Sequence, residues 1–342
     1  MTKILIIGAG AMGSAFSIPL IENKNDVTLA GTHLEDKLIE NIKSNNNVHP
    51  ALNTSLPNSL KIVKFDKLAG ALESGVDVIV CGISSVGIQW FVEQISKTYK
   101  KNLPIVLLTK GLAIVDNELS TLSEKIKKLL QSKGYDQINI SAIKGPCLAA
   151  GLANKMRTGT IIANPDTKEA QFLKKIITTD YYSTEISNDL DGVELSGAIK
   201  NIYSMLIGAS EGLSNSKAPI EIQSKYYLNT AASLIHRSIS EMVEFVSYYG
   251  GKPETVYGLA GLGDLYVSAI GGRNSLMGKH LGQGHLYKDI KEKFMKKITV
   301  EGAQLALEIG PNILSELDQK HFPLMFNMLS AICDNKKLEI NW

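Results

Sequence analysis

The stretch Ile4–Ala15, which reads ILIIGAGAMGSA, decides the fold class of this chain. Four apolar residues come first, and Gly8, Gly10 and Gly13 follow with the spacing G-x-G-x-x-G. In a strand–turn–helix unit the first glycine makes the tight turn, the second lets the backbone approach a pyrophosphate, and the third lets helix and strand pack closely. A second apolar run begins near residue 27, so the context predicts a dinucleotide site. The alternative is a tight turn that binds nothing.

The first half of the chain alternates short β-branched runs with amphipathic segments. This alternation predicts βαβ units and a doubly wound sheet. Helices are expected at 86–99 and 118–133, and the Asn-rich stretch 41–57 is expected to be a loop. Several of the expected strands are apolar without alternation, as parallel strands covered on both faces are. The expected strands are 3–8, 27–31, 60–65, 76–83, 104–110, 138–144, 159–163 and 182–186.

The second half predicts helices only, at 191–212, 225–249 and 300–308. The fold class is therefore α/β, with an N-terminal Rossmann doubly wound sheet and a C-terminal all-helical domain. We place the dinucleotide-binding domain at residues 1–188 and the helical substrate-binding domain at 189–342.

Composition narrows the function. The chain has 342 residues and a net charge of +2, which gives no electrostatic argument for nucleic acid or a membrane surface as partner. No apolar run is long enough to span a bilayer. The cysteines, Cys81, Cys147 and Cys333, are odd in number and far apart, and the histidines show no metal-ligand spacing. These features predict a reduced, cytoplasmic protein without a metal.

Two lysines stand where lysine is unusual. Lys200 is the only cation in a helical segment that is apolar on nearly every face, and lysines are rarely buried without a partner. Lys110 ends an expected buried strand, and open α/β sheets bind ligands beyond the carboxyl ends of their strands. A snorkelling Lys200 and a solvated Lys110 are the alternatives.

The stretch 261–274, GLGDLYVSAIGGRN, places single charges among glycines and apolar residues. The fork of Arg273 fits a phosphate dianion, and Asn274 adds a neutral donor. A carboxylate at Asp264 could keep a desolvated Lys200 charged. The alternative is a structural loop in which Asp264 and Arg273 pair with each other.

The cofactor type follows from the end of the second strand. A site specific for NAD usually has an acid there, which binds the ribose hydroxyls. This strand ends Ala30-Gly31-Thr32-His33, and the next acid is Glu35. The cofactor is therefore NAD or NADP, with NADP slightly favoured.

Taken in order, these motifs resemble the NAD(P)-dependent glycerol-3-phosphate dehydrogenase family of soluble bacterial and archaeal enzymes. The resemblance covers residues 4–302 and is carried by the glycine motif and by TKGL, GPCLA, ELSGAIKNIY, AGLGDLYVSAIGGRN and VEG, which begin at residues 109, 145, 194, 260 and 300. It implies an oxidoreductase that has a Rossmann domain and interconverts dihydroxyacetone phosphate and sn-glycerol 3-phosphate. The glycerol 3-phosphate would supply glycerophospholipid synthesis.

The resemblance also implies roles for single residues. The catalytic residues would be Lys200, Lys110 and Asp264. Substrate would be bound by Lys110, Gly145, Cys147, Asp264, Gly272, Arg273 and Asn274. The cofactor would be bound by Gly8, Gly10, Ala11, Met12, Gly13, Thr32, Lys110, Ala149, Arg273, Thr299 and Glu301.

Five positions depart from the family pattern. Many relatives read SGP followed by Ser, Thr or Ala, whereas this chain has Lys144 and Cys147 at those places. Gly151 replaces a common acid, Gly272 a common serine, and Ser268 a frequent threonine.

Two other functions fit the sequence less well. A related two-domain β-hydroxyacid or ketopantoate-type reductase would share the domains and a helix lysine but would lack the GGRN motif. A non-catalytic NAD(P)H sensor would have no reason to keep Lys110, Lys200 and Asp264 together. Either way the buried helical domain favours a homodimer.

Overall fold

The chain divides into two compact units. The computed structural model describes residues 1–100, 102–214 and 220–340, with the side chains of 220–226 outside the description. Unit 1 comprises Met1–Lys110 and Leu122–Leu190, and unit 2 comprises Gly111–Thr121 and Asp191–Trp342. The domain limits 1–188 and 189–342 stay a prediction, and they did not set apart the segment 111–121, which belongs with unit 2.

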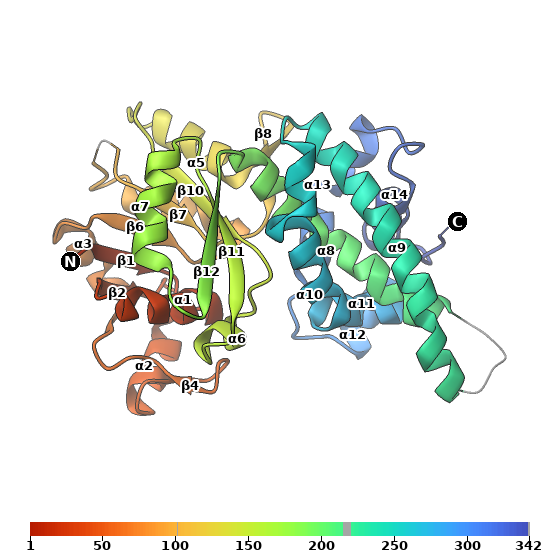
Figure 1. Cartoon of the computed structure of the whole chain (residues 1–342), viewed down its shortest axis with the longest axis horizontal. Coiled ribbons are helices and arrows are strands. Elements are labelled where there is room, and N and C mark those ends of the chain that lie inside the picture. The colour runs from red at the N-terminus through yellow and green to blue at the C-terminus, as the bar shows by residue number, and fades with distance from the viewer. Residues whose placement is uncertain (101, 215–219, 341–342) are drawn as a thin grey trace. The chain divides into compact units, whose positions relative to one another are not determined.

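An eight-stranded sheet is the centre of unit 1 (Figure 1). Its strand order is β12-β11-β10-β7-β6-β1-β2-β5, in which the order reverses between β1 and β6 as it does in dinucleotide-binding folds. Every strand expected from the sequence is present. The strands are β1 Lys3–Ile7, β2 Asp26–Ala30, β5 Lys61–Val63, β6 Val78–Cys81, β7 Ile105–Leu107, β10 Ile140–Lys144, β11 Thr158–Ala163 and β12 Tyr182–Ser187.

Neighbouring strands from β5 to β10 are parallel, as expected. The expectation was wrong at one place, because β11 runs antiparallel to β10, although β12 is again parallel to β11. The link between β10 and β11 holds only the short helix α6, Ala149–Ala153, and not the longer helix that usually carries a parallel crossover.

Helices cover the sheet of unit 1. Helices α1, Ala11–Glu22, and α7, Thr167–Ile177, contact each other, and so do α4, Ile88–Ile95, and α5, Leu122–Gln131. The stretch 41–57 is not the continuous loop that was expected. It contains the end of α2, Asp36–Ser44, and the small hairpin of β3, Val48–His49, and β4, Thr54–Ser55. The remaining helix is α3, Leu68–Glu73.

Unit 2 is built around helix α8, Leu190–Leu213, which is buried on all faces from Gly192 to Ser210. The apolar sequence of this segment is the reason. Gly278 shows how closely its neighbours pack, because a Cβ there would lie 1.9 Å from the carbonyl oxygen of Met205. The other helices are α9 Ile220–Tyr248, α10 Asp264–Ile270, α11 Arg273–Gly282, α12 Tyr287–Lys293, α13 Glu301–Glu316 and α14 Pro323–Cys333.

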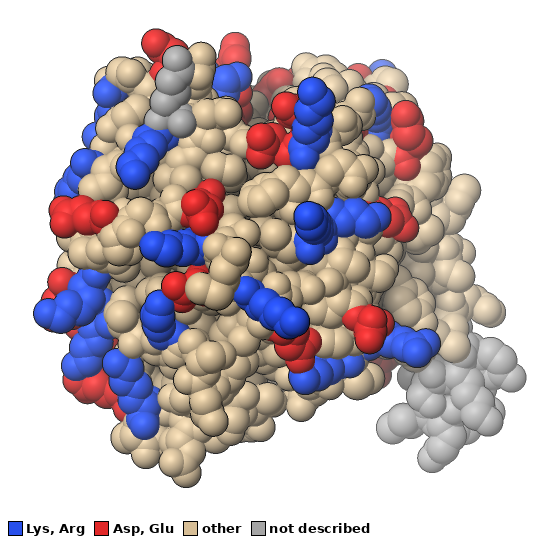
Figure 2. Space-filling model, turned by 60° about the vertical axis from the view of Figure 1, so that its left-hand side comes forward, with Lys and Arg blue, Asp and Glu red and all other residues tan. Residues whose placement is uncertain are grey.

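A hairpin of β8, Leu112–Val115, and β9, Glu118–Thr121, belongs to unit 2. It corrects one expectation, because the helix expected at 118–133 begins only at Leu122. In the second half of the chain the described residues form helices and no strand, as the sequence predicted. Among the described residues no helix is long and apolar enough to cross a membrane. Figure 2 shows positive and negative side chains interspersed on one face.

A buried carboxylate ties three helices of unit 2 together. Glu241 of α9 is 6% exposed and accepts hydrogen bonds from the backbone N–H groups of Leu324 (2.7 Å) and Met325 (3.0 Å). It also accepts one from the hydroxyl of Tyr203 on α8 (3.0 Å). The carboxylate thus satisfies two N–H groups at the start of α14, where the first N–H groups of a helix lack helical partners. Burial nevertheless raises the pKa of Glu241 to about 7.

This pKa predicts a pH dependence of stability. A carboxyl with a pKa near 7 in the folded chain and an ordinary pKa when unfolded holds its proton more tightly in the folded state. Its stabilising contribution is complete below pH 4.5 and is lost as the pH rises through 7. We expect Glu241→Gln to flatten the fall in thermal midpoint between pH 5 and 7.5. The exposed control Glu292→Gln should keep the wild-type profile, and parallel profiles for Glu241→Gln and wild type would contradict the assignment.

Candidate active site

The glycine-rich turn lies between β1 and α1 and has the geometry of a phosphate cradle. Gly8 adopts a φ of +113°, and Gly10 is the N-cap of α1. No described side chain caps this helix, so its first N–H groups face outward with the partial positive charge of the helix end. Ala11 and Met12 form the first turn. A Cβ at Gly10 would have only Glu35 within 4 Å, which leaves room for a pyrophosphate.

Gly13 has the packing role that its spacing predicts. A Cβ there would lie 2.2 Å from the carbonyl oxygen of Gly8, so only glycine lets α1 approach the turn this closely. Six expected cofactor residues lie at the carboxyl edge of the sheet. They are Thr32, which follows β2, and the turn residues Gly8, Gly10, Ala11, Met12 and Gly13. They fit a dinucleotide, whose phosphates need open space, outward N–H groups and a positive helix end.

Glu35 was not among the expected site residues, yet it contacts this turn. One carboxylate oxygen accepts hydrogen bonds from the N–H groups of Ala9 (3.0 Å) and Thr32 (2.8 Å). An acid therefore stands near the end of β2 after all, but two backbone amides already bind it. In the sequence, the only signal that Glu35 belongs to this site was its position as the first acid after β2.

The ends of β7 and β10 carry the second group of expected residues in unit 1. The ammonium group of Lys110 donates to the carbonyl oxygen of Gly145 (3.4 Å), and the N–H of Cys147 donates to the same oxygen (2.7 Å). Cys147 is half-buried, and Ala149 begins α6. Nearby, burial raises the pKa of the Cys81 thiol to about 11, so this cysteine stays protonated at neutral pH.

Lys144 is the second residue that sequence reasoning did not place in the site. It appeared only as a departure from the family pattern, but its side chain is 2% exposed. Its ammonium group donates to the carbonyl oxygens of Thr109 (2.6 Å) and Leu107 (3.4 Å). A buried charge must be hydrogen-bonded to be tolerated, and these strand carbonyls provide the bonds.

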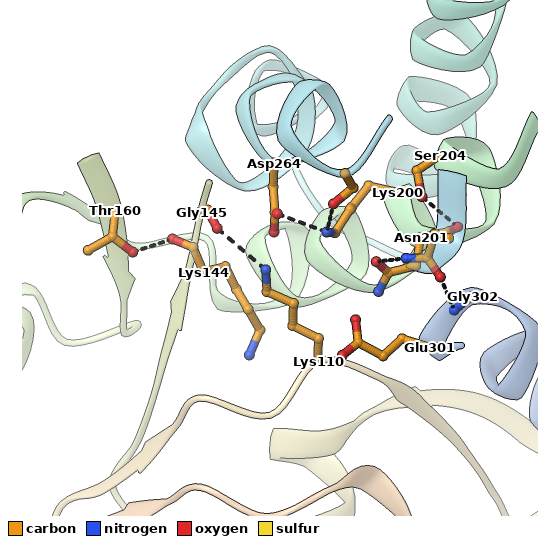
Figure 3. Close-up of polar contacts among 12 residues, drawn as sticks. Lys110, Lys144, Gly145, Thr160, Lys200, Asn201, Ser204, Asp264, Glu301 and Gly302 are labelled. Carbon is orange, nitrogen blue, oxygen red and sulfur yellow. Dashed lines mark hydrogen bonds and ion pairs between the residues drawn. The ribbon is translucent and has the colours of Figure 1, made fainter. Parts of the chain in front are cut away.

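The centre of the site in unit 2 is a buried ion pair. The ammonium group of Lys200 lies 2.8 Å from a carboxylate oxygen of Asp264, and both side chains are 3% exposed (Figure 3). Lys200 also donates to the hydroxyl of Ser268. A turn of π-helix at Leu259–Gly263 leads into α10 and brings Asp264 to its first position. Burial excludes a snorkelling Lys200, and the pairing excludes the loop in which Asp264 binds Arg273.

Asn274 holds three helices beside this pair. Its side-chain amide donates to the side-chain oxygen of Asn201 on α8 (2.9 Å), and its own side-chain oxygen accepts from the N–H of Gly302 on α13 (2.9 Å). Asn201 directly follows Lys200, so this bridge fixes the part of α8 that carries the lysine (Figure 3).

Arg273 lies at the start of α11 and is about half exposed. Its guanidinium group pairs with the carboxylate of Glu301 at 2.8 Å. Gly272, with a φ of +104°, is the N-cap of this helix, and no described side chain caps it. The exposed Thr299 precedes α13, which Glu301 begins. The expected residues thus lie in three groups, two in unit 1 and one in unit 2. Among the described residues no group of His, Cys, Asp and Glu could hold a metal ion.

Comparison with known proteins identifies the family. Residues 3–170 match the N-terminal part of the NAD-dependent glycerol-3-phosphate dehydrogenase family, and residues 189–340 match its C-terminal part. An NADP(+)-dependent glycerol-3-phosphate dehydrogenase of Archaeoglobus fulgidus is 33% identical over 294 residues, which is 86% of this chain and 84% of that protein. The chain belongs to this family.

Solved structures agree with this assignment. Glycerol-3-phosphate dehydrogenase from Coxiella burnetii superposes with a TM-score of 0.81 and 26% identity, over 98% of this chain and 96% of that one. A PanE/ApbA family ketopantoate reductase from Ralstonia eutropha has a TM-score of 0.53 and 12% identity, over 97% of this chain and 99% of that one. That second likeness shows the fold alone, so the ketopantoate-type alternative is not favoured.

Two substitutions separate the packing role of Gly13 from the binding role of Gly10. We expect Gly13→Ala to lower the thermal midpoint, because its Cβ would collide with backbone. Gly10→Ala should fold normally but bind NADPH at least tenfold more weakly, because its Cβ enters the space left for phosphate. Calorimetry and NADPH fluorescence titration measure the two effects. Unchanged NADPH affinity in Gly10→Ala would contradict the cradle.

Proposed function

We propose that this glycerol-3-phosphate dehydrogenase reduces dihydroxyacetone phosphate to sn-glycerol 3-phosphate, and catalyses the reverse reaction, at a site centred on Lys200. The buried pair of Lys200 with Asp264 carries the proposal. Each ion costs several kcal/mol to bury, and an ion pair gives weak evidence for stability alone. In a chain of this family, the best explanation for an ammonium group held out of water is that it takes part in the reaction.

Lys200 acts as the acid during reduction. Bound NAD(P)H supplies a hydride to the ketone carbon. The ammonium group of Lys200 stabilises negative charge as it develops on the carbonyl oxygen and transfers a proton to that oxygen. Asp264 keeps the lysine charged before the transfer, and Ser268 fixes the direction of its ammonium group. In the reverse direction neutral Lys200 takes the proton back from the alcohol.

Arg273 binds the phosphate of the substrate. Its fork makes two parallel hydrogen bonds to a phosphate, and the start of α11 adds backbone N–H groups and positive helix charge. Gly272 lets the phosphate approach this turn. Because an amide nitrogen carries two hydrogens, Asn274 can hold Asn201 and a phosphate oxygen at once. Binding energy gained at this remote group positions the reacting ketone.

Unit 1 carries Lys110 and the cofactor site. Lys110, held by Gly145, orients the carbonyl group together with Cys147. The glycine-rich turn binds the dinucleotide, because its open space can accept the phosphates and its outward N–H groups can donate to them. Further contacts with the cofactor come from Thr32, Lys110, Ala149, Arg273, Thr299 and Glu301.

The cofactor is NAD or NADP, and NADP is our first choice. Positions 31–34 contain no acid that would repel a 2′-phosphate, and the A. fulgidus relative is named as NADP(+)-dependent. Glu35 is the nearest acid, and two backbone amides already bind its carboxylate. Initial rates with NADH and NADPH test this choice.

Three further properties belong to this proposal for the enzyme. It is cytoplasmic, which its three cysteines support, since none of them forms a disulfide in the described structure. It forms a homodimer, which exposed apolar side chains of unit 2 such as Leu228, Tyr248 and Tyr266 support. Its product supplies glycerophospholipid synthesis, since glycerol 3-phosphate is the backbone of these lipids. Mass measurement in solution tests the dimer.

Replacing Lys200 tests the proposed acid. We expect Lys200→Met to lower kcat with dihydroxyacetone phosphate by about a thousandfold, because it removes both the proton donor and the charge that stabilises the alkoxide. Affinity for NADPH should stay within about twofold, since that site lies on the glycine-rich turn. The absorbance of the reduced nicotinamide gives the rate, and Lys168→Met is the exposed control. A Lys200→Met enzyme with wild-type kcat would disprove this role.

Replacing Arg273 tests the phosphate site. Arg273→Lys keeps the charge but loses the planar fork, so kcat/KM should fall by about ten- to a hundredfold, chiefly through KM. A ketone with a carboxylate in place of the phosphate should be a poor substrate for the wild type. Faster reduction of the carboxylated ketone would instead support the β-hydroxyacid or ketopantoate-type alternative. Tight NADPH binding without turnover of either ketone would support the sensor.

A further inference from the structure

The ends of β7 and β10 are linked by two lysines in a reciprocal arrangement. Lys110, beyond the end of β7, donates to the carbonyl oxygen of Gly145, beyond the end of β10. Lys144, the last residue of β10, donates to the carbonyl oxygen of Thr109, which directly precedes Lys110. Each strand end thus gives a lysine to the carbonyl of the other. Figure 3 shows the bond from Lys110 to Gly145.

The sheet register explains why these residues meet. In the parallel pair of β7 and β10, Ala142 lies opposite Leu107. If this register is continued, Lys144 comes level with Thr109 and Gly145 with Lys110, in agreement with their hydrogen bonds. A third strand secures the arrangement, because the hydroxyl of Thr160 on β11 donates to the carbonyl oxygen of Lys144 (2.6 Å).

Burial makes the lysine at position 144 costly. Its side chain is 2% exposed, and a lysine is almost never buried so completely without a compensating partner. An apolar side chain of the same length would avoid the desolvation, and such replacements of buried charges are often neutral or stabilising. The strand carbonyls of Leu107 and Thr109 satisfy the ammonium group, but they do not explain why a charge is there.

We propose that Lys144 is a positioning residue for Lys110. Its ammonium group holds the carbonyl of Thr109 and thereby fixes the backbone from which the Lys110 side chain extends. It also fixes the strand end that carries Gly145, the carbonyl on which the Lys110 ammonium group rests. Lys144 itself touches neither substrate nor cofactor. This inference rests on the proposed role of Lys110.

A double-mutant cycle tests the inference in the full-length enzyme. Lys144→Met keeps the length of the side chain and removes its charge. We expect it to lower kcat/KM for dihydroxyacetone phosphate about tenfold while NADPH affinity and thermal midpoint hold or rise. In a Lys110→Met background, assayed at high enzyme concentration, Lys144→Met should change the residual rate less than twofold, because the residue it positions is gone.

A second substitution of Lys144 and a control variant complete the test of this inference. Lys144→Ser removes the charge with a small polar side chain that cannot crowd the strands, so it should fold even if Lys144→Met does not, and it should show the same loss and the same non-additivity. The exposed Lys168→Met is the matched control, with wild-type rates. A tenfold loss that persists in the Lys110→Met background, or a wild-type rate in Lys144→Met or Lys144→Ser, would overturn the inference. A fully active Lys110→Met enzyme would instead overturn the proposed role of Lys110.

Discussion

The buried pair of Lys200 and Asp264 is the constraint on which unit 2 depends. An ammonium group at 3% exposure is tolerable only if a carboxylate meets it, and that carboxylate is 64 residues away in the chain. Helix α8 must therefore be enclosed by its neighbours, and the π-helical turn before α10 must end where Asp264 can reach the lysine. The glycines that let α11 press on α8 are part of the same requirement, because a wider separation would admit water.

Local features of the sequence predicted most of the fold. Most strands of the main sheet are short apolar or β-branched runs between turn residues, and the helix that carries Lys200 is apolar all round, so periodicity and composition were sufficient. The hairpin at 112–121 was missed because Glu118–Thr121 looks like the start of the amphipathic helix that follows. The antiparallel pairing of β11 with β10 was missed because direction depends on where the chain returns, which no local pattern records.

For the candidate site, the sequence singled out residues but not the partners that the structure gives them. Lys110, Lys200 and Asp264 stand out because charges are rare in apolar surroundings. Which charge meets which depends on tertiary packing, and the sequence left Asp264 with a choice between Lys200 and Arg273. Glu35 and Lys144 were overlooked for the same reason, since each acts through backbone groups that a sequence pattern does not show.

The two ion pairs formed by the candidate site residues of unit 2 differ in a way that matches the tasks proposed for them. The pair of Lys200 with Asp264 is sealed from water, so breaking it would leave a buried charge at high cost. The pair of Arg273 with Glu301 is half exposed, and such pairs contribute only about 0–1 kcal/mol. A phosphate dianion can displace or join Glu301 at little cost and gain charge-assisted hydrogen bonds to the guanidinium group. A permanent pair suits the group that transfers a proton, and an exchangeable pair suits the group that must bind and release substrate in every turnover.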